Sequence, residues 1–213
     1  MAKTESEAKL VQYLSEAYSK EKELETALQA HIGLATRATY RKRLQQHLQE
    51  TKRHGRDVER RIKQLGGNGT AELAATVQAA AAKALALAQG PLHAVRGTGE
   101  AERQLKNAKT EYANEAEEIA TYTAIEALAE SVGDRDTAQL ARAIRRDEER
   151  MGSFLERLIP QLTRAVAQAE IPASQRRSTS RRRSSSRSRS RSAGSRSNSG
   201  RASGRRKASA SSR

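Results

Sequence analysis

Residues 115–128 read Glu-Ala-Glu-Glu-Ile-Ala-Thr-Tyr-Thr-Ala-Ile-Glu-Ala-Leu, and this stretch decides the predicted fold. Apolar or small residues recur at helical spacing along one side, at Tyr112, Ile119, Thr123 and Ala127. Glu115 and Glu118 interrupt that side within one turn of each other. A carboxylate that faces the core of a helix bundle is unfavourable unless something neutralises it, and a metal ion is the usual agent. The stretch therefore predicts a helix over residues 100–132 that contributes acids to a metal site, provided that other helices do the same.

A first helix is predicted over residues 5–32, and it has one acid on its apolar side. The apolar positions follow steps of three and four residues, at Leu10, Leu14, Ala17, Leu24 and Leu28. Glu21 occupies the place in this series between Ala17 and Leu24. The other acids of the segment fall outside the series, and exposure to solvent explains them. Glu21 is therefore the candidate ligand of this helix.

A second helix is predicted over residues 38–65, where a Gly-rich segment follows as a stop signal. Glu50 lies three residues after His47 and four before His54, so the three side chains project from neighbouring turns of one side. Di-iron bundles pair a Glu with a His one turn away, although their usual spacing is Glu-x-x-His. Alternatively, the histidines are edge residues that hydrogen-bond the carboxylate, and for either histidine alone this structural role is the more common one.

The fourth main helix is predicted over residues 136–166. Its apolar series runs through Ala141, Ile144, Met151, Leu155, Leu158 and Leu162. Glu148 falls in this series, whereas Asp147 and Glu149 point elsewhere and are interpreted as solvated charges. Pro160 lies inside the pattern and should kink or shorten the helix.

An Ala-rich helical segment between residues 70 and 90 is interpreted as a crossover helix packed on one side of the main bundle. His93 follows it and is assigned no chemistry. The chain contains no cysteine, which excludes disulfides and thiolate metal sites, and with no Trp and one Phe its core must consist of Ala, Leu, Ile and Val. No apolar run is long enough to predict a membrane span or a cleaved leader, so we expect an all-α cytoplasmic protein.

The C-terminal part of the chain has a different composition. Residues 174–213 contain fourteen of the 40 Lys and Arg residues, sixteen Ser and no acid, so the remainder is close to neutral. Such a segment cannot bury enough apolar surface to fold. The sequence thus predicts a helical bundle in residues 1–172 and a disordered basic tail in residues 173–213.

The tail predicts non-specific binding to nucleic acid, because flexible cations bind phosphate polymers by releasing counterions. This would permit association with the nucleoid. A Ser-Arg segment switched by phosphorylation and a tether to another anionic surface are the alternatives. The cations expected to contact phosphates are Arg176, Arg177, Arg181, Arg182, Arg183, Arg187, Arg189, Arg191, Arg205, Arg206 and Lys207.

Between Leu10 and Leu162 the chain resembles the ferritin-like stress proteins of the YciE/YciF type. The resemblance rests on Tyr18-x-x-Glu21-Lys22-x-Leu24, His47-Leu48-x-Glu50-Thr51, Glu115-x-x-Glu118-Ile119-Ala120-x-Tyr122 and Asp147-Glu148. It implies a ferritin-like four-helix bundle with an extra crossover helix, a homodimer, and carboxylate ligands at Glu21, Glu50, Glu115 and Glu148. The chain departs from the wider di-iron pattern at Met151, where a His would complete Glu-x-x-His.

The predicted metal ligands are Glu21, Glu50, His54, Glu115, Glu118 and Glu148. Oxygen and imidazole ligands without thiolate favour a di-iron site, or Mn, over copper(I) or structural zinc. We expect Glu50 and Glu148 to bridge two metal ions, with Glu21 and Glu115 as terminal ligands. Such a site would oxidise Fe(II) with oxygen or peroxide, and the tail would bring that reaction next to nucleic acid.

A non-catalytic scaffold is the competing function. In that case the acids would be hydrogen-bonded polar groups of the core, and the bundle would only deliver a nucleic-acid-binding tail. The two functions differ in whether the acids bind a metal, so the sequence leaves open whether the protein is an enzyme.

Overall fold

The computed structural model describes residues 4–67, 82 and 99–176. These residues form four long helices and a short 3-10 helix: α1 (Glu5–Leu34), α2 (Ala38–Gln64), α5 (Glu100–Ser131), α6 (Arg135–Glu170) and η1 (Ala173–Gln175). The predicted all-α fold is confirmed, and the described residues contain no strand. The predicted crossover helix and His93 lie outside the described residues, as does the predicted tail beyond residue 176.

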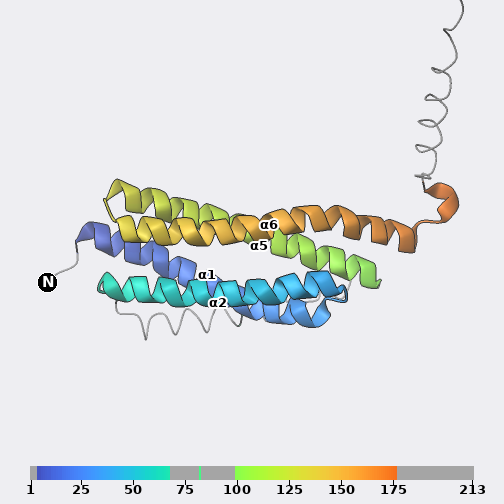
Figure 1. The fold of residues 1–213 in the computed structure, drawn as a ribbon, viewed down its shortest axis with the longest axis horizontal. Helices are drawn as coiled ribbons and strands as arrows, with labels where there is room; N and C mark the ends of the chain where they lie inside the picture. The colour runs from blue at the N-terminus through green and yellow to red at the C-terminus, as the bar shows by residue number, and fades with distance from the viewer. Residues whose placement is uncertain (1–3, 68–81, 83–98, 177–213) are drawn as a thin grey trace, which may run out of the picture. The chain divides into compact units, whose positions relative to one another are not determined.

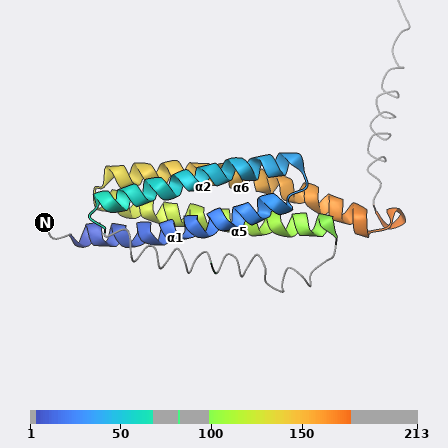
Figure 2. The same ribbon diagram turned by 90° about the horizontal axis from the view of Figure 1, so that it is seen from below.

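The four long helices belong to one compact unit, Met1–Ile171. They form two antiparallel hairpins, α1 with α2 and α5 with α6, and the hairpins pack together through α1 beside α5 and α2 beside α6 (Figures 1 and 2). Because α2 and α5 run in the same direction, the end of α2 and the start of α5 lie at opposite ends of the bundle (Figure 1). This up-down-down-up order is the ferritin-like form of a four-helix bundle.

Local signals in the sequence explain where the helices begin and turn. Thr4 and Glu7 form a reciprocal capping box at the start of α1. Gly133, with a φ of 78°, supplies the left-handed residue that the tight turn from α5 to α6 requires. Asp134 then caps α6 by accepting a hydrogen bond from the backbone N–H of Thr137 at 3.0 Å.

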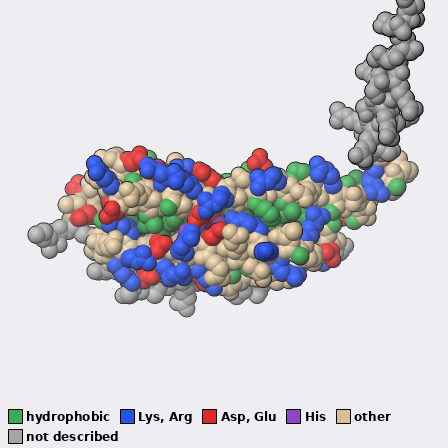
Figure 3. Space-filling model, viewed as in Figure 1, with side chains coloured by type: hydrophobic (Ala, Val, Ile, Leu, Met, Phe, Trp, Pro, Cys, Tyr) green, Lys and Arg blue, Asp and Glu red, His purple; other side chains and the backbone are tan. Residues whose placement is uncertain are grey.

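The hydrophobic core is divided into two clusters along the length of the bundle. The first contains Leu10, Leu14, Ala17, Val58, Ile62, Leu65, Tyr122, Ile125, Ala129, Ala138, Ala141 and Ile144. The second contains Leu28, Ala35, Tyr40, Leu44, Leu48, Ala108, Met151, Leu155, Leu158 and Leu162. We call them the first and the second apolar layer. On the face formed by α2 and α6, hydrophobic side chains are visible along the seam between the two helices (Figure 3).

The apolar series predicted for α1 and α6 are confirmed, since every member is buried. The series predicted for α5 is wrong: Tyr112 is 40% exposed, and Thr123 and Ala127 are exposed as well. The helix instead buries a series that begins with acids and ends with apolar residues: Glu111, Glu115, Glu118, Tyr122, Ile125 and Ala129. The physical reason is that the acids of α5 have partners on other helices, so the helix turns its acids rather than its small residues inward.

Pro160 does not end α6, which continues to Glu170. Proline removes the hydrogen bond to the carbonyl of the residue four positions earlier, here Glu156. Both Pro160 and Glu156 are exposed, so water can solvate that carbonyl and the loss is tolerated.

Candidate metal centre

A polar layer of buried ionisable side chains separates the two apolar layers. All four helices contribute, and none of the six residues is more than 1% exposed. They are Glu21 of α1, His47 and His54 of α2, Glu115 and Glu118 of α5, and Glu148 of α6. We refer to these six residues as the polar layer.

The polar layer contains two groups of potential ligands that share Glu148. His47, Glu115, Glu118 and Glu148 form one group, and Glu21, His54 and Glu148 form the other. In the first group, His47 Nε2 lies 3.2 Å from Glu115 Oε1 and 3.4 Å from Glu148 Oε2. In the second, His54 Nδ1 lies 2.9 Å from Glu148 Oε1 and 3.6 Å from Glu21 Oε1. The two oxygens of Glu148 thus face different histidines, as a bridging carboxylate requires.

Each histidine is held from behind by a second carboxylate. Glu50 Oε2 lies 3.1 Å from His47 Nδ1, and Asp147 Oδ2 lies 3.1 Å from His54 Nε2. If each carboxylate accepts a proton from the ring nitrogen nearest to it, the other nitrogen of that ring keeps a free lone pair toward the polar layer. This carboxylate–histidine arrangement is the one that commonly orients histidine ligands of metals.

Several oxygens of the polar layer have no hydrogen-bond partner within the described part of the chain. They are Glu21 Oε2, Glu115 Oε2 and both carboxylate oxygens of Glu118. Buried polar atoms without partners are rare in folded proteins, and an ion is one of the explanations they require. Glu21 is only half satisfied, because Tyr122 Oη donates to its Oε1 at 2.5 Å.

The environment of the polar layer shifts the pKa values of its acids in two directions. Burial raises the pKa of Glu21 and of Glu115 to about 8, and it raises the pKa of Glu118 well above the ordinary value. Burial acts on Glu148 too, but the hydrogen bond with His54 and the charges of both histidines hold its pKa below the ordinary value. Without a metal ion, the four acids therefore do not all carry a negative charge at the same pH.

His47 behaves as the cation of this layer. Burial alone lowers its pKa, but hydrogen bonds with Glu115 and Glu50 raise the pKa to about 10. A metal ion bound beside His47 would have to displace that proton, together with the protons of the neutral acids.

Glycines on two helices face the acids of the polar layer. A Cβ added at Gly55 would lie 3.8 Å from Glu21 Cβ, and one added at Gly152 would lie 3.8 Å from Glu115 Cβ. Both distances are ordinary van der Waals contacts, so longer side chains at these positions would reach the acids. The glycines thus allow α2 and α6 to approach the helices that carry Glu21 and Glu115.

The structure places the six predicted ligands as follows. Glu21, His54, Glu115, Glu118 and Glu148 all lie in the polar layer, whereas Glu50 belongs to neither group. Glu50 also accepts from Arg43 Nη1 at 2.9 Å, which draws it toward the surface. Glu50 contacts His47, whose ring takes the inner place, so these contacts do not favour the predicted bridging role of Glu50, which stays a prediction.

Sequence reasoning did not choose His47 as a ligand and did not expect Asp147 to be buried. Asp147 was interpreted as a solvated charge, but it is 6% exposed and contacts His54 and Arg53. Sequence reasoning had no signal for this contact, because it arises from the packing of α6 against α2. It also missed Glu111, one turn before Glu115, which forms a buried pair with His31.

The predicted nucleic-acid contacts fall almost entirely outside the described residues. Only Arg176 is described, directly after η1. The prediction for the basic tail therefore stays a prediction.

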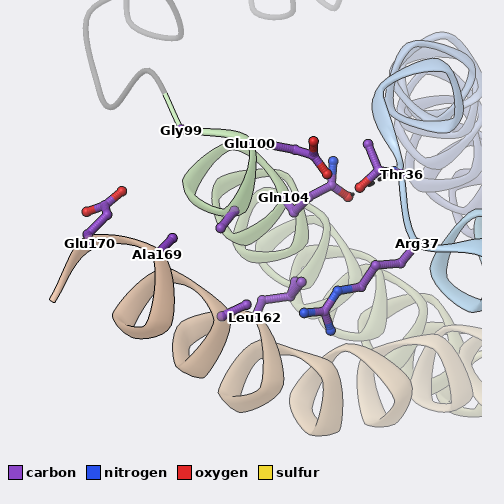
Figure 4. Close-up of a pocket in the computed structure, with 10 residues that line it drawn as sticks. Thr36, Arg37, Gly99, Glu100, Gln104, Leu162, Ala169 and Glu170 are labelled. Carbon is purple, nitrogen blue, oxygen red and sulfur yellow. Dashed lines mark hydrogen bonds between the residues drawn. The ribbon is translucent and has the colours of Figure 1, made fainter. Parts of the chain in front are cut away.

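A separate cavity of about 720 Å³ lies at the end of the bundle where α5 begins and α6 ends (Figure 4). Gln104 closes one side by donating to the carbonyl of Leu34 and accepting from the N–H of Thr36. None of the polar-layer residues lines this cavity, so it is distinct from the candidate metal centre. Among the described residues, no helix has the length and apolar character needed to cross a membrane.

Sequence comparison places the chain in a family. A profile for a domain of unknown function, DUF892, matches residues 5–168, which include the whole polar layer and all four helices except the last two residues of α6. The chain belongs to the DUF892 family. No curated protein matches the chain.

Solved structures similar to this DUF892 chain share its fold. A protein from Xanthomonas campestris pv. campestris is 25% identical with a TM-score of 0.62, covering 78% of this chain and 99% of its own. YcfI from Rhodopseudomonas palustris is 22% identical with a TM-score of 0.56, covering 72% and 94%. The Escherichia coli stress protein YciF is 19% identical with a TM-score of 0.59, covering 76% and 98%. The fold of this chain is thus the YciF-like helical bundle.

Proposed function

We propose that the protein is a ferritin-like stress-response protein that binds two iron or manganese ions in its polar layer and oxidises Fe(II) at the expense of peroxide or oxygen. We further propose that its basic tail binds nucleic acid without sequence preference. The fold shared with the E. coli stress protein YciF supports the biological context. The chemistry of the polar layer supports the activity.

One observation is central to this proposal. Buried carboxylate oxygens without hydrogen-bond partners converge with two ring nitrogens in two groups that share Glu148. Oxygen and imidazole donors suit Fe and Mn, and the described residues offer no sulfur ligand in either group. The donor set therefore fits a pair of divalent ions better than it fits a hydrogen-bonded core.

The residues of the chain have distinct roles in this proposal. Glu148 would offer one oxygen to each ion, while Glu50 and Asp147 keep His47 and His54 in the orientation in which a ring nitrogen faces inward. A bound pair of Fe(II) ions would supply two electrons, which with two protons are enough to reduce one peroxide to two waters. The acids of the layer, whose pKa values burial raises, would release protons when the ions enter.

Anaerobic titration of the full chain with Fe(II) tests the metal site. We expect saturation near two ions per chain for the wild type and no uptake for Glu148→Ala, because this variant removes the ligand common to both groups. Glu156→Ala is the matched control, since Glu156 lies on the exposed side of the same helix. The control should bind like the wild type.

The alternative scaffold function makes the opposite forecast for the same titration. If the wild type binds no more Fe(II) or Mn(II) than Glu148→Ala, the polar layer is structural and the proposed activity fails. If the wild type does bind Fe(II), peroxide is added to the anaerobic complex. Absorbance of a ferric product identifies a redox site, and its absence identifies a site that only binds metal.

The tail is tested by removing residues 177–213 and measuring binding to duplex DNA. If the tail contacts roughly 6–10 phosphates, affinity of the full chain should fall about 10³–10⁵-fold between 50 and 200 mM salt. The shortened chain should lose most of its affinity at low salt while its thermal unfolding is unchanged. Undiminished binding after truncation would contradict the assignment of DNA binding to the tail.

A further inference from the structure

A basic groove lies on the face of the bundle formed by α2 and α6, outside the polar layer. It has a volume of about 570 Å³, and four arginines line it: Arg43 of α2 and Arg146, Arg150 and Arg157 of α6. Glu149, Ser153 and Phe154 complete the lining. We call it the arginine groove. Figure 3 shows this face, on which Lys and Arg side chains flank the seam between α2 and α6.

The arginine groove has more positive charge than its acids neutralise. The side chains of Arg146 and Arg157 are exposed, and within the described part of the chain neither side chain forms an ion pair or a hydrogen bond. The acid in the lining, Glu149, is bound by Arg145, which lies outside the lining. Two of the four arginines of the groove are thus available to an anionic partner.

The other two arginines are already oriented by carboxylates. Arg43 donates to Glu50, and Arg150 pairs with Asp147, so each extends from a fixed position into the groove. Donors that are held in place before a ligand arrives bind it at a smaller entropic cost. Glu50 and Asp147 are the same carboxylates that hold His47 and His54, so the arginine groove lies directly outside the candidate metal centre.

The spacing of the arginines fits an extended anion rather than a single small one. Arg146 and Arg157 are eleven residues apart on α6, which at 1.5 Å per residue is about 16 Å. Along one strand of DNA the phosphates are about 3.4 Å apart in the axial direction, so about four or five phosphates span this length. Guanidinium groups bind phosphates in a bidentate manner, whereas no enclosed cavity here surrounds a single oxyanion.

We propose that the arginine groove binds the phosphate backbone of duplex DNA, so that the bundle, and not the tail alone, contacts nucleic acid beside the metal centre. The proposal extends the nucleic-acid binding proposed for the tail, but it rests on different residues. Contacts of this kind are with phosphates only, so they position the DNA without reading its sequence.

The first experiment compares the salt dependence of duplex binding in full-length variants. Arg146→Gln combined with Arg157→Gln should reduce the magnitude of the slope of log Kobs against log [salt] by about 2, which is the loss of two phosphate contacts. The matched control combines Arg56→Gln with Arg164→Gln, which removes the same charge from exposed positions of α2 and α6 outside the groove. The control should keep the wild-type slope.

A crosslinking experiment locates the contact, because the chain has no cysteine of its own. Ser153→Cys, inside the groove, and Ser131→Cys, at the exposed end of α5, are each labelled with a photoactivated crosslinker and mixed with duplex DNA. We expect crosslinks to form several times more often from position 153 than from position 131. The Arg146→Gln and Arg157→Gln background should remove that difference.

The outcomes separate this proposal from the one for the tail. Wild-type slopes in both double variants, or equal crosslinking from the two positions, would overturn the groove as a DNA site while leaving tail binding intact. Loss of all DNA binding on truncation at residue 176 would overturn it too. Equal losses in the groove variant and its control would mean that only total charge matters, which also contradicts a specific groove.

Discussion

The polar layer and the two apolar layers are built by the same four helices and are equally buried, yet their chemistry is opposite. Leu14 and Leu155 in the apolar layers and Glu118 and Glu148 in the polar layer are all at most 1% exposed. Packing explains the apolar layers, because burying each large aliphatic side chain is favourable by about 1.5–3 kcal/mol. It does not explain the polar layer, where burial is unfavourable and several oxygens are left without partners. The difference indicates that the apolar layers stabilise the bundle and the polar layer serves a function.

The largest effect on the stability of the metal-free chain should come from an apolar layer. We expect Leu14→Ala to lower the free energy of unfolding by about 2–5 kcal/mol, because it leaves a cavity among residues of all four helices. Urea unfolding followed by circular dichroism measures this. Leu34→Ala is the control, since Leu34 is 53% exposed and its truncation should change stability by less than about 0.5 kcal/mol.

A smaller effect, on metal affinity rather than on folding, should follow from removing a carboxylate that orients one of the histidines. We expect Asp147→Ala to weaken Fe(II) or Mn(II) binding by about 10–100-fold, because His54 loses the group that orients its ring. Glu149→Ala, two residues further along α6 and at the surface, should bind metal like the wild type. Equal affinity of Asp147→Ala and the wild type in a competition titration would show that Asp147 has no such role.

The polar layer should also give the metal-free chain an unusual dependence on pH. The pKa values of Glu21 and Glu115 are about 8 in the folded chain, against an ordinary value of 4.5. Between these values the folded chain binds protons that the unfolded chain has released, so the free energy of unfolding falls as the pH rises from 4.5 to 8. His47, with its pKa raised to about 10, acts in the same direction above its ordinary value of 6.5.

Unfolding by urea in the presence of a chelator, repeated across this window, checks the pH prediction. Metal affinity should change in the opposite direction and rise with pH, because the entering ions displace those protons. A metal-free chain that gains stability from pH 4.5 to pH 8 would show that the acids are ionised and paired in the folded state.

Most of the fold was predictable, and the reason is visible in α1 and α6. Their apolar series repeat at helical spacing, so the buried face and the inward acids Glu21 and Glu148 follow from periodicity alone. In α5 periodicity failed, because the chain offers small residues on several sides. There the buried face was decided by His47, which contacts Glu115, and by Glu21, which accepts from Tyr122.

The arrangement within the site was less predictable for a related reason. Glu50 and His47 lie one turn apart on the same side of α2, so spacing cannot tell which of them is the ligand. Arg43 settles this by binding Glu50 at the edge of the bundle. Asp147 became a partner of His54 only through the packing of α6 against α2, and no pattern within α6 contains that information.

The most direct test of the difference between the layers is the free energy of unfolding of Glu118→Leu and the wild type, each measured with and without Mn(II). Both oxygens of Glu118 lack a hydrogen-bond partner in the described structure, so its replacement by an apolar residue removes an unfavourable group. A metal-binding role of the polar layer predicts that the metal-free variant is at least as stable as the wild type, and that Mn(II) stabilises the wild type much more than the variant. A metal-free variant less stable than the wild type, together with no stabilisation of either chain by Mn(II), would contradict it.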